Sequence, residues 1–414
     1  MGSEGRSGGA IPGRFPFLLS NFLAGDIQTG IMPLTSIDLL LGERWRSGEV
    51  GLVLAFGSLA LLVFQPLAGH LADRIVSKRA LFFLLTASFA VGCLLLAGHP
   101  SLPRALLSQL FLGAAQGGLM PVLGSIAMGL AGSGGFPKLT GWAQGAGHAG
   151  SVFGAASVLL IALHGSFFAI FLFYALSSLL AGLVLFGVPG KAIDLRRARE
   201  EEGGAAPLPV SRIFSLPFAL FLLVLLFFFV ANTAMLPLAG DKLSEIVLSE
   251  PPARVMAFLV LVTQAVMIPF SFGAPALVRK VGADGLLLSF ALFLLAIRGG
   301  LLSETRSVPG ILVGQLMDGT VMGIFSVLLP VLVAEYARGS GRFNLLQGLA
   351  GAVVSAGGSL SQLLSGRCLD ALGVDRTLLV LSGVALVGAL LSIVSWRSGI
   401  LDLSRGARGA SRDR

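Results

Sequence analysis

Charged residues are scarce in this sequence: Asp, Glu, Lys and Arg together make up 12% of its 414 positions. Soluble domains carry about twice that share, so most of the molecular surface does not face water. Apolar runs of 18 or more residues recur along the whole chain, which excludes a soluble fold and indicates repeated membrane-spanning helices. A β-barrel is excluded as well, because its strands alternate in polarity and these runs are continuous.

Cysteine is almost absent. Cys93 and Cys368 lie in opposite halves without the spacing of metal ligands, so the sequence predicts no disulfide framework, no metal site and no cofactor. The nucleotide-binding string Gly-x-x-x-x-Gly-Lys-Ser/Thr does not occur, which argues against an ATP-driven process. Residues 1–14 lack the apolar segment and cleavage site of a signal peptide. We expect the chain not to be an enzyme, since no nucleophile–base pair stands out.

The net charge of +8 is unevenly distributed. With the N-terminus placed in the cytoplasm and the loops taken in alternation, the cytoplasmic side holds 20 of the 29 basic residues and the other side 8. This bias follows the positive-inside rule and predicts a multi-pass protein of the cell inner membrane with both termini cytoplasmic. The basic loops are expected to meet anionic lipid headgroups rather than nucleic acid.

Twelve apolar runs are long enough to cross a bilayer, and a charged break separates the first six from the last six. We therefore expect an all-α membrane protein with 12 helices in two pseudo-symmetric six-helix bundles. The expected parts are a tail (1–14), the first bundle (15–188), a central loop (189–212), the second bundle (213–396) and a basic tail (397–414). The expected spans are 15–41, 48–71, 80–98, 104–130, 139–163, 165–188, 213–239, 253–278, 285–302, 309–335, 345–366 and 377–396.

The two halves are related by an internal repeat. Gly132–Phe136 recurs as Gly339–Phe343, an offset of 207, and Gln109-Leu110 recurs as Gln315-Leu316. In the first span of each half, Gln28–Leu34 matches Asn232–Leu238. Two homologous bundles with a site at their interface, near the bilayer midplane, are suited to alternating access by rocking.

One motif resembles a known family. Residues 65–79 read Gln-Pro-Leu-Ala-Gly-His-Leu-Ala-Asp-Arg-Ile-Val-Ser-Lys-Arg, which is similar to the Gly-x-Leu-x-Asp-Arg signature of the major facilitator superfamily. The resemblance implies that this loop holds the cytoplasmic gate shut through charge contacts with neighbouring helix ends. The alternative is that its basic residues only fix topology. The gate residues are then Gly69, Asp73, Arg74, Lys78 and Arg79.

The sequence departs from this pattern in three places. The equivalent loop of the second half, Pro275–Lys280, carries no acidic residue, so any gate is asymmetric. Gln109 stands where the superfamily's drug–proton antiporters carry arginine, and Gly147–Gly150 lacks the Gly-Pro pair typical of those antiporters. The resemblance therefore stops at the superfamily.

Ionisable residues within spans usually face a cavity. Asp26 lies near the midplane of the first span, where burial would make its carboxyl a proton carrier or, alternatively, a fixed hydrogen-bonded acid. His148 shares a helix face with Gln144 one turn earlier. Its imidazole could carry a proton or bind an anionic group, or it could be satisfied by a neighbouring hydroxyl or carbonyl.

Arg298 and Asp318 lie in the ninth and tenth spans and could form a neutralising ion pair. A structural pair is the favoured interpretation over one that opens during transport. Further candidates are uncharged residues that could contact a solute, namely Gln28, Asn232, Gln264 and Gln315.

These patterns lead to one expectation, a monomeric secondary transporter of a small organic solute that is driven by protons. The resemblance to the superfamily implies that transport is directed outward. Proton-coupled uptake is the near alternative, and a membrane-embedded sensor or enzyme is a more distant one. The sequence leaves the substrate, the direction, the coupling ion and its stoichiometry open.

Overall fold

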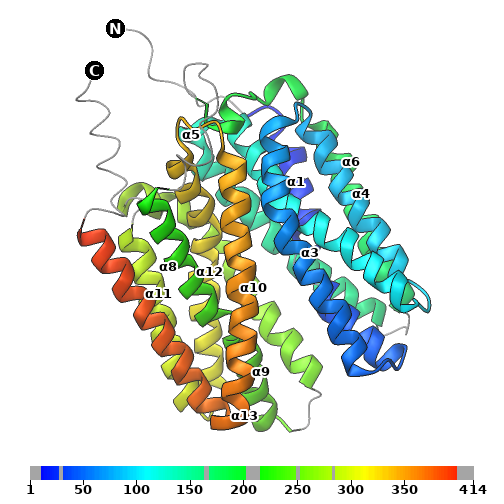
Figure 1. The fold of residues 1–414 in the computed structure, drawn as a ribbon, viewed down its shortest axis with the longest axis vertical. Helices are drawn as coiled ribbons and strands as arrows, with labels where there is room; N and C mark the ends of the chain where they lie inside the picture. The colour runs from blue at the N-terminus through cyan, green and yellow to red at the C-terminus, as the bar shows by residue number, and fades with distance from the viewer. Residues whose placement is uncertain are drawn as a thin grey trace.

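The computed structural model describes residues 11–27, 31–162, 167–201, 215–248, 252–281 and 285–398. Within those ranges the regular elements are all helices, and Figure 1 shows most of them running side by side along one direction. An all-helical architecture is what apolar runs dictate in lipid, because a helix satisfies its backbone hydrogen bonds within itself. The predicted fold class is confirmed.

The first half begins with a broken span and continues through four long helices. Three short helices follow them, the first at the end of the predicted sixth span and the other two in the central loop. Residues 202–214 lie outside the described ranges, so the predicted domain bounds stay a prediction. The elements are α1 (Arg14–Ala24), η1 (Gly25–Ile27), α2 (Ile31–Ile37), η2 (Asp38–Gly42), α3 (Ser47–Arg74), α4 (Lys78–Leu96), α5 (Leu102–Ala162), α6 (Phe167–Val184), η3 (Leu185–Gly187), η4 (Gly190–Ala192) and η5 (Arg197–Arg199).

The second half repeats this plan with a broken span followed by long helices. Its elements are α8 (Leu216–Asn232), α9 (Met235–Ile246), α10 (Pro252–Val281), α11 (Gly285–Glu304), α12 (Val308–Ala337) and α13 (Phe343–Arg397).

Two helices are too long to cross a bilayer once. α5 has 61 residues and α13 has 55, whereas about 20 suffice for one crossing. Each contains a glycine with non-helical dihedral angles, Gly132 at φ 63° and Gly373 at φ 78°, and both glycines fall between predicted spans. In the described residues nine helices are long and apolar enough to cross a membrane. Two of the nine, α5 and α13, each contain two spans, and the interrupted first span is not among the nine. The count is therefore consistent with twelve spans.

The first span of each half departs from a continuous α-helix. In the first half α1 gives way to the short helix η1 at Gly25, and residues 28–30, which precede α2, lie outside the described residues. In the second half α8 ends at Asn232 and α9 begins at Met235, and the backbone N–H of Ala234 between them donates to Ser361 Oγ at 3.0 Å. The sequence analysis expected both spans to be continuous, which is corrected here.

The halves meet along α3 with the first part of α13 and along α5 with α10. We call the end of the molecule that holds the C-terminal end of α3 and the N-terminal end of α13 the basic end. Figure 1 shows α3 close to the first part of α13 there, with the two diverging toward the opposite end.

Candidate functional site

A cavity of about 410 Å³ lies between the two halves. Its wall is mixed, with aromatic, methionine and aliphatic side chains interrupted by amides, hydroxyls and one histidine, as expected of a small-molecule site. Its polar lining residues are Asn21, Thr140, Gln144, His148, Ser151, Asn232, Thr233, Thr263, Gln264, Asp318 and Gln347.

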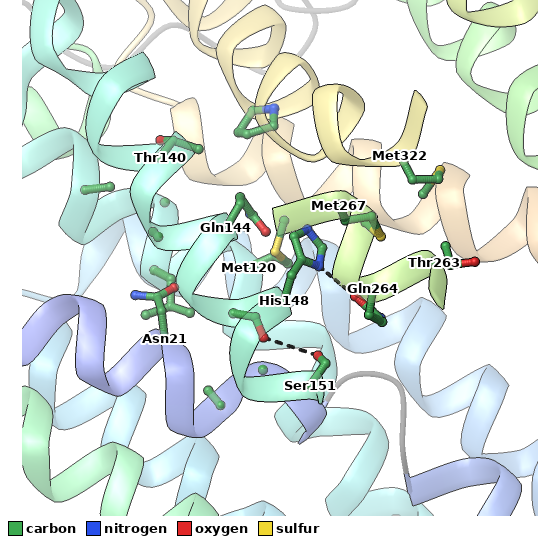
Figure 2. A pocket seen from close by; sticks show the side chains of 18 of the residues that line it. Asn21, Met120, Thr140, Gln144, His148, Ser151, Thr263, Gln264, Met267 and Met322 are labelled. Atoms are coloured by element: carbon green, nitrogen blue, oxygen red, sulfur yellow. Dashed lines mark hydrogen bonds between the residues drawn. The ribbon is translucent and has the colours of Figure 1, made fainter. Parts of the chain in front are cut away.

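One face of α5 supplies the polar stripe of the first-half wall. Thr140, Gln144, His148 and Ser151 follow one another at helical spacing of three or four residues, so they point the same way. Figure 2 shows them along one helix, with His148 directed at Gln264 of α10.

His148 joins the two halves at the centre of the cavity. Its Nδ1 lies 2.8 Å from Gln264 Oε1, a hydrogen bond between side chains 116 positions apart in the sequence. With the amide oxygen as acceptor, Nδ1 carries the proton and Nε2 keeps the lone pair. Nε2 has no hydrogen-bond partner among the described residues. The imidazole is therefore held in place through one nitrogen and free to accept a proton or a donor through the other.

The opposite wall contains a buried ion pair. Arg298 Nη1 lies 2.9 Å from Asp318 Oδ1 and donates to Asn232 Oδ1 at 2.7 Å, while Arg298 Nε donates to Gly314 O at 3.1 Å. Asp318 and Asn232 line the cavity, and Arg298, only 1% exposed, lies outside its lining. The pair leaves this wall with no net charge.

Contacts from the motif at residues 65–79 join the two halves at the basic end. Asp73 Oδ1 accepts from the backbone N–H of Asn344 at 3.2 Å and from its side-chain amide at 2.8 Å, and Asp73 Oδ2 accepts from Leu345 N at 2.9 Å. The carboxylate thus caps the first turn of α13, where free N–H groups and the helix dipole favour a negative charge. A Cβ on Gly69 would lie 2.2 Å from Asn344 O, so only glycine allows this approach.

The basic residues of the motif bind backbone oxygens near the same end. Lys78, 1% exposed, donates through Nζ to Ala72 O, and Arg79 Nη1 donates to Val188 O at 2.9 Å. The side chain of Arg74 is exposed, and its carbonyl accepts from Arg199 Nη2 at 3.4 Å. The motif therefore bridges the halves through Asp73, while Lys78 holds its own loop and Arg79 ties that loop to the segment after α6.

The remaining sequence candidates lie as follows. Gln144, His148, Asn232, Gln264 and Asp318 line the cavity. Gln315 is fully buried behind the wall, where its Oε1 accepts from the cavity residue Thr263 at 3.1 Å. The side chain of Asp26 and the whole of Gln28 lie outside the described residues, although the neighbouring Gly25 lines the cavity.

Sequence reasoning missed several residues. Asn21, Thr140 and Gln347 line the cavity, and the helical spacing of Thr140 from Gln144 was a signal that could have identified it. Lys242, one of the eight basic residues counted on the outer side, is 2% exposed, with Nζ donating to Leu302 O, Ser303 O and Asp375 Oδ1 at 2.6–2.9 Å. No local sequence pattern predicts this cluster, because the partners of Lys242 lie at least 60 positions away in the chain.

Comparisons with known proteins agree on one family. The model of the Major Facilitator Superfamily matches residues 17–355. The uncharacterized MFS-type transporter Rv2456c of Mycobacterium tuberculosis strain H37Rv is 30% identical over 398 residues, covering 93% of this chain and 94% of its own. Its counterpart MT2531 in strain CDC 1551 matches to the same extent.

The fold also matches a solved structure, that of the human organic anion transporter MFSD10 (TETRAN). The TM-score is 0.67, with 18% sequence identity over 92% of this chain and 98% of that one. The family model, the relatives and the shared fold lead to one conclusion: the chain belongs to the major facilitator superfamily and is a multi-pass membrane transporter.

Proposed function

We propose that this chain exports a small organic solute in exchange for protons, with the cavity between its halves as the shared site. The observation that supports this most directly is the position of His148. It lies on the cavity wall, its Nδ1 bridges the two halves through Gln264, and its Nε2 has no partner among the described residues. The His148 side chain thus provides both an atom that can accept a proton and a contact between the two halves, which must move relative to each other during transport.

Protonation of His148 would place a positive charge in the cavity while keeping the Nδ1–H donor on Gln264. Nε2 would change from an acceptor into a donor, so the hydrogen bonds it offers a solute would be reversed. Solute and proton would then compete for this atom, which is the requirement for exchange. Asp318 supplies a second titratable group on the facing wall, and Asp26 stays a candidate carrier from the sequence.

The cavity wall favours a solute with little net charge. Among the described residues its single carboxylate, Asp318, is neutralised by Arg298, so a multiply charged solute would lose its hydration without finding partners. Phe17, Phe136 and Phe229 offer apolar contact area. An amphipathic molecule with an aromatic or aliphatic body and one or two polar groups suits this wall. The transporter of similar fold is named for organic anions, so singly charged anions belong in the test panel.

We assign the basic end to the cytoplasm, following the excess of Lys and Arg in the loops placed there. The contacts of Asp73 and Gly69 with Asn344 close that end. On this assignment the structure is a form closed toward the cytoplasm, and alternating access requires Asp73 to release α13.

The test is solute-driven proton flux in proteoliposomes with a pH-sensitive dye trapped inside. Wild type, Asp26→Asn, His148→Gln and Asp318→Asn are compared over a panel of neutral, monoanionic and monocationic amphipaths. Asp370→Asn, an exposed carboxylate on α13, is the matched control. We expect flux in wild type and control and at least a tenfold loss in His148→Gln.

Direction is read in the same vesicles. An imposed proton gradient should expel solute against its own gradient if the chain is an exporter and accumulate it if the chain is an uptake symporter. Solute movement by the wild type that does not change with the imposed proton gradient would refute proton coupling. Proton flux equal to that of the wild type in all three variants would mean that Asp26, His148 and Asp318 do not carry the coupled proton.

A further inference from the structure

A second hollow lies on the side of the second half, away from the central cavity. It has a volume of about 370 Å³, lies between α10, α11 and α12, and has an almost entirely apolar wall. Phe290 in this wall is 60% exposed, so the hollow opens on the outer surface of the helix bundle. We call it the lateral groove. Its main wall residues are Leu277, Leu287, Phe290, Leu294, Ile324 and Leu328.

The lateral groove runs from the basic end into the depth of the membrane. On α11 its wall extends from Leu286, in the first turn, to Leu294. At 1.5 Å per residue this is about 12 Å, which is within one leaflet of the hydrocarbon core. The shape fits one extended hydrocarbon chain that enters from the membrane surface.

Two basic residues follow the groove residue Leu277 at the end of α10. Lys280 is one turn beyond Leu277 and therefore on the same helix face, whereas Arg279, two positions beyond Leu277, lies at a similar depth on another face. Both are exposed, and neither forms an ion pair or hydrogen bond within the described part of the chain. Asp284 follows in the sequence outside the described residues, so residues 279–284 carry a net charge of +1.

The internal repeat explains why this pair is free. In the first half, Asp73 caps α13 and the basic side chains of Lys78 and Arg79 are bound to backbone carbonyls. The equivalent segment of the second half, Pro275–Lys280, has no carboxylate, so it cannot form the same latch. The positive charge of Arg279 and Lys280 is thus available to another partner.

We propose that the lateral groove binds one anionic phospholipid of the bilayer, with an acyl chain between α10, α11 and α12 and its phosphate on Lys280, while Arg279 adds positive charge at the same membrane depth. The apolar wall alone would not select a lipid, since every lipid tail is equally apolar. The basic pair supplies the selection, because juxtamembrane Lys and Arg attract anionic headgroups. The charge of the headgroup therefore determines which lipid binds more tightly.

The test is native mass spectrometry of the purified full-length chain, equilibrated with equal amounts of phosphatidylglycerol and phosphatidylcholine that have identical tails. Wild type should keep one phosphatidylglycerol in preference to phosphatidylcholine. Arg279→Gln/Lys280→Gln should reduce that preference roughly twenty-fivefold, since each basic residue contributes roughly fivefold. Ala291→Trp, which fills the groove wall, should lower retention of both lipids.

The matched control is Arg367→Gln/Arg376→Gln, which removes the same charge from exposed positions on α13, and it should behave as wild type. Soluble glycerol phosphate in excess should not displace the lipid, because it lacks the tail. An unchanged preference in Arg279→Gln/Lys280→Gln, or an equal loss in the control, would overturn the proposal. So would full retention in Ala291→Trp, a variant that keeps both charges.

Discussion

Phe136 and Phe343 occupy equivalent positions in the two repeats and pack edge to face, with ring centroids 5.5 Å apart and ring planes at 89°. Both are at most 1% exposed, and Phe136 also lines the central cavity. The pair therefore lies where the two halves meet and forms the wall between the cavity and the basic end. Aromatic pairs of this geometry contribute about 0.5–1.5 kcal/mol beyond the area they bury.

We expect Phe136→Ala to make the cavity accessible from the basic end. Removing a buried phenyl ring leaves a void and costs about 3–5 kcal/mol of packing, and this packing belongs to the closed form. The measurement is the labelling rate of Thr140→Cys, a cavity position, by a membrane-impermeant thiol reagent in inside-out vesicles. Phe136→Leu, which keeps most of the volume, is the control. Equal labelling rates with and without the Phe136→Ala substitution would contradict a closing role.

Asp73→Asn should also weaken the closed form. The substitution removes the charge that caps α13 while keeping the size of the side chain, and charge-assisted hydrogen bonds of this kind contribute about 1.5–3 kcal/mol. Spin labels on Val76→Cys and Arg338→Cys, both exposed in the structure, would report the distance between the ends of α3 and α12. In Asp73→Asn, a larger fraction of molecules should show a longer distance between the two labels. An unchanged distribution would mean that the cap is dispensable for closure.

Asp318→Asn should destabilise the protein, because it leaves the buried Arg298 guanidinium without its counter-charge. Breaking a buried pair costs about 3–5 kcal/mol, whereas replacing both members with apolar residues is often neutral. We therefore expect Arg298→Met/Asp318→Leu to unfold at a higher temperature than Asp318→Asn. Thermal unfolding in detergent gives the comparison. A double variant less stable than the single one would show that the pair contributes more than mutual neutralisation.

Two glycines on neighbouring turns of α5 should respond differently to the same change. A Cβ on Gly150 would lie 1.8 Å from Phe22 O, whereas a Cβ on Gly147 would meet nothing nearer than Asn21 O at 3.8 Å. Gly150→Ala should force α1 and α5 apart and cost about 1–3 kcal/mol. Gly147→Ala should be neutral or slightly stabilising, since alanine favours a helix. Equal unfolding temperatures would refute the close approach of α1 to α5.

The pKa of His99, in the segment between α4 and α5, should lie above its ordinary value of 6.5, because Glu43 hydrogen-bonds its ring and favours the imidazolium. Glu43→Gln should lower it, and NMR titration of the His99 ring proton measures the change. A raised pKa in the folded state means that the contact stabilises the protein at low pH and that this stabilisation is lost as the pH rises through the folded-state pKa. A pKa unaffected by Glu43→Gln would contradict the pairing.

Sequence patterns were sufficient for the parts of the molecule that depend on local chemistry. Apolar runs located the helices, and the repeat located the two halves. Helical spacing placed Gln144 and His148 on one face, and both line the cavity. The ion pair between Arg298 and Asp318 could be considered because both charges are buried in apolar spans and each needs a partner.

What the sequence could not reveal depends on contacts distant along the chain. Asp73 is hydrogen-bonded to Asn344, 271 positions away in the sequence, and Lys242 to Asp375, 133 positions away. No sequence spacing predicts either contact. The interruptions at Gly25–Ile27 and at residues 233–234 were also hidden, because the flanking residues are apolar enough to look like one continuous span. Tertiary hydrogen bonds, such as the one from Ala234 to Ser361, compensate for the interruption.

The internal repeat has a consequence for the history of the chain. Asp38 in the first half and Lys242 in the second occupy equivalent positions, and both are at most 5% exposed. Because the two positions descend from one ancestral residue, this residue changed in at least one copy after duplication. The duplicated halves thus bury opposite charges at one shared position.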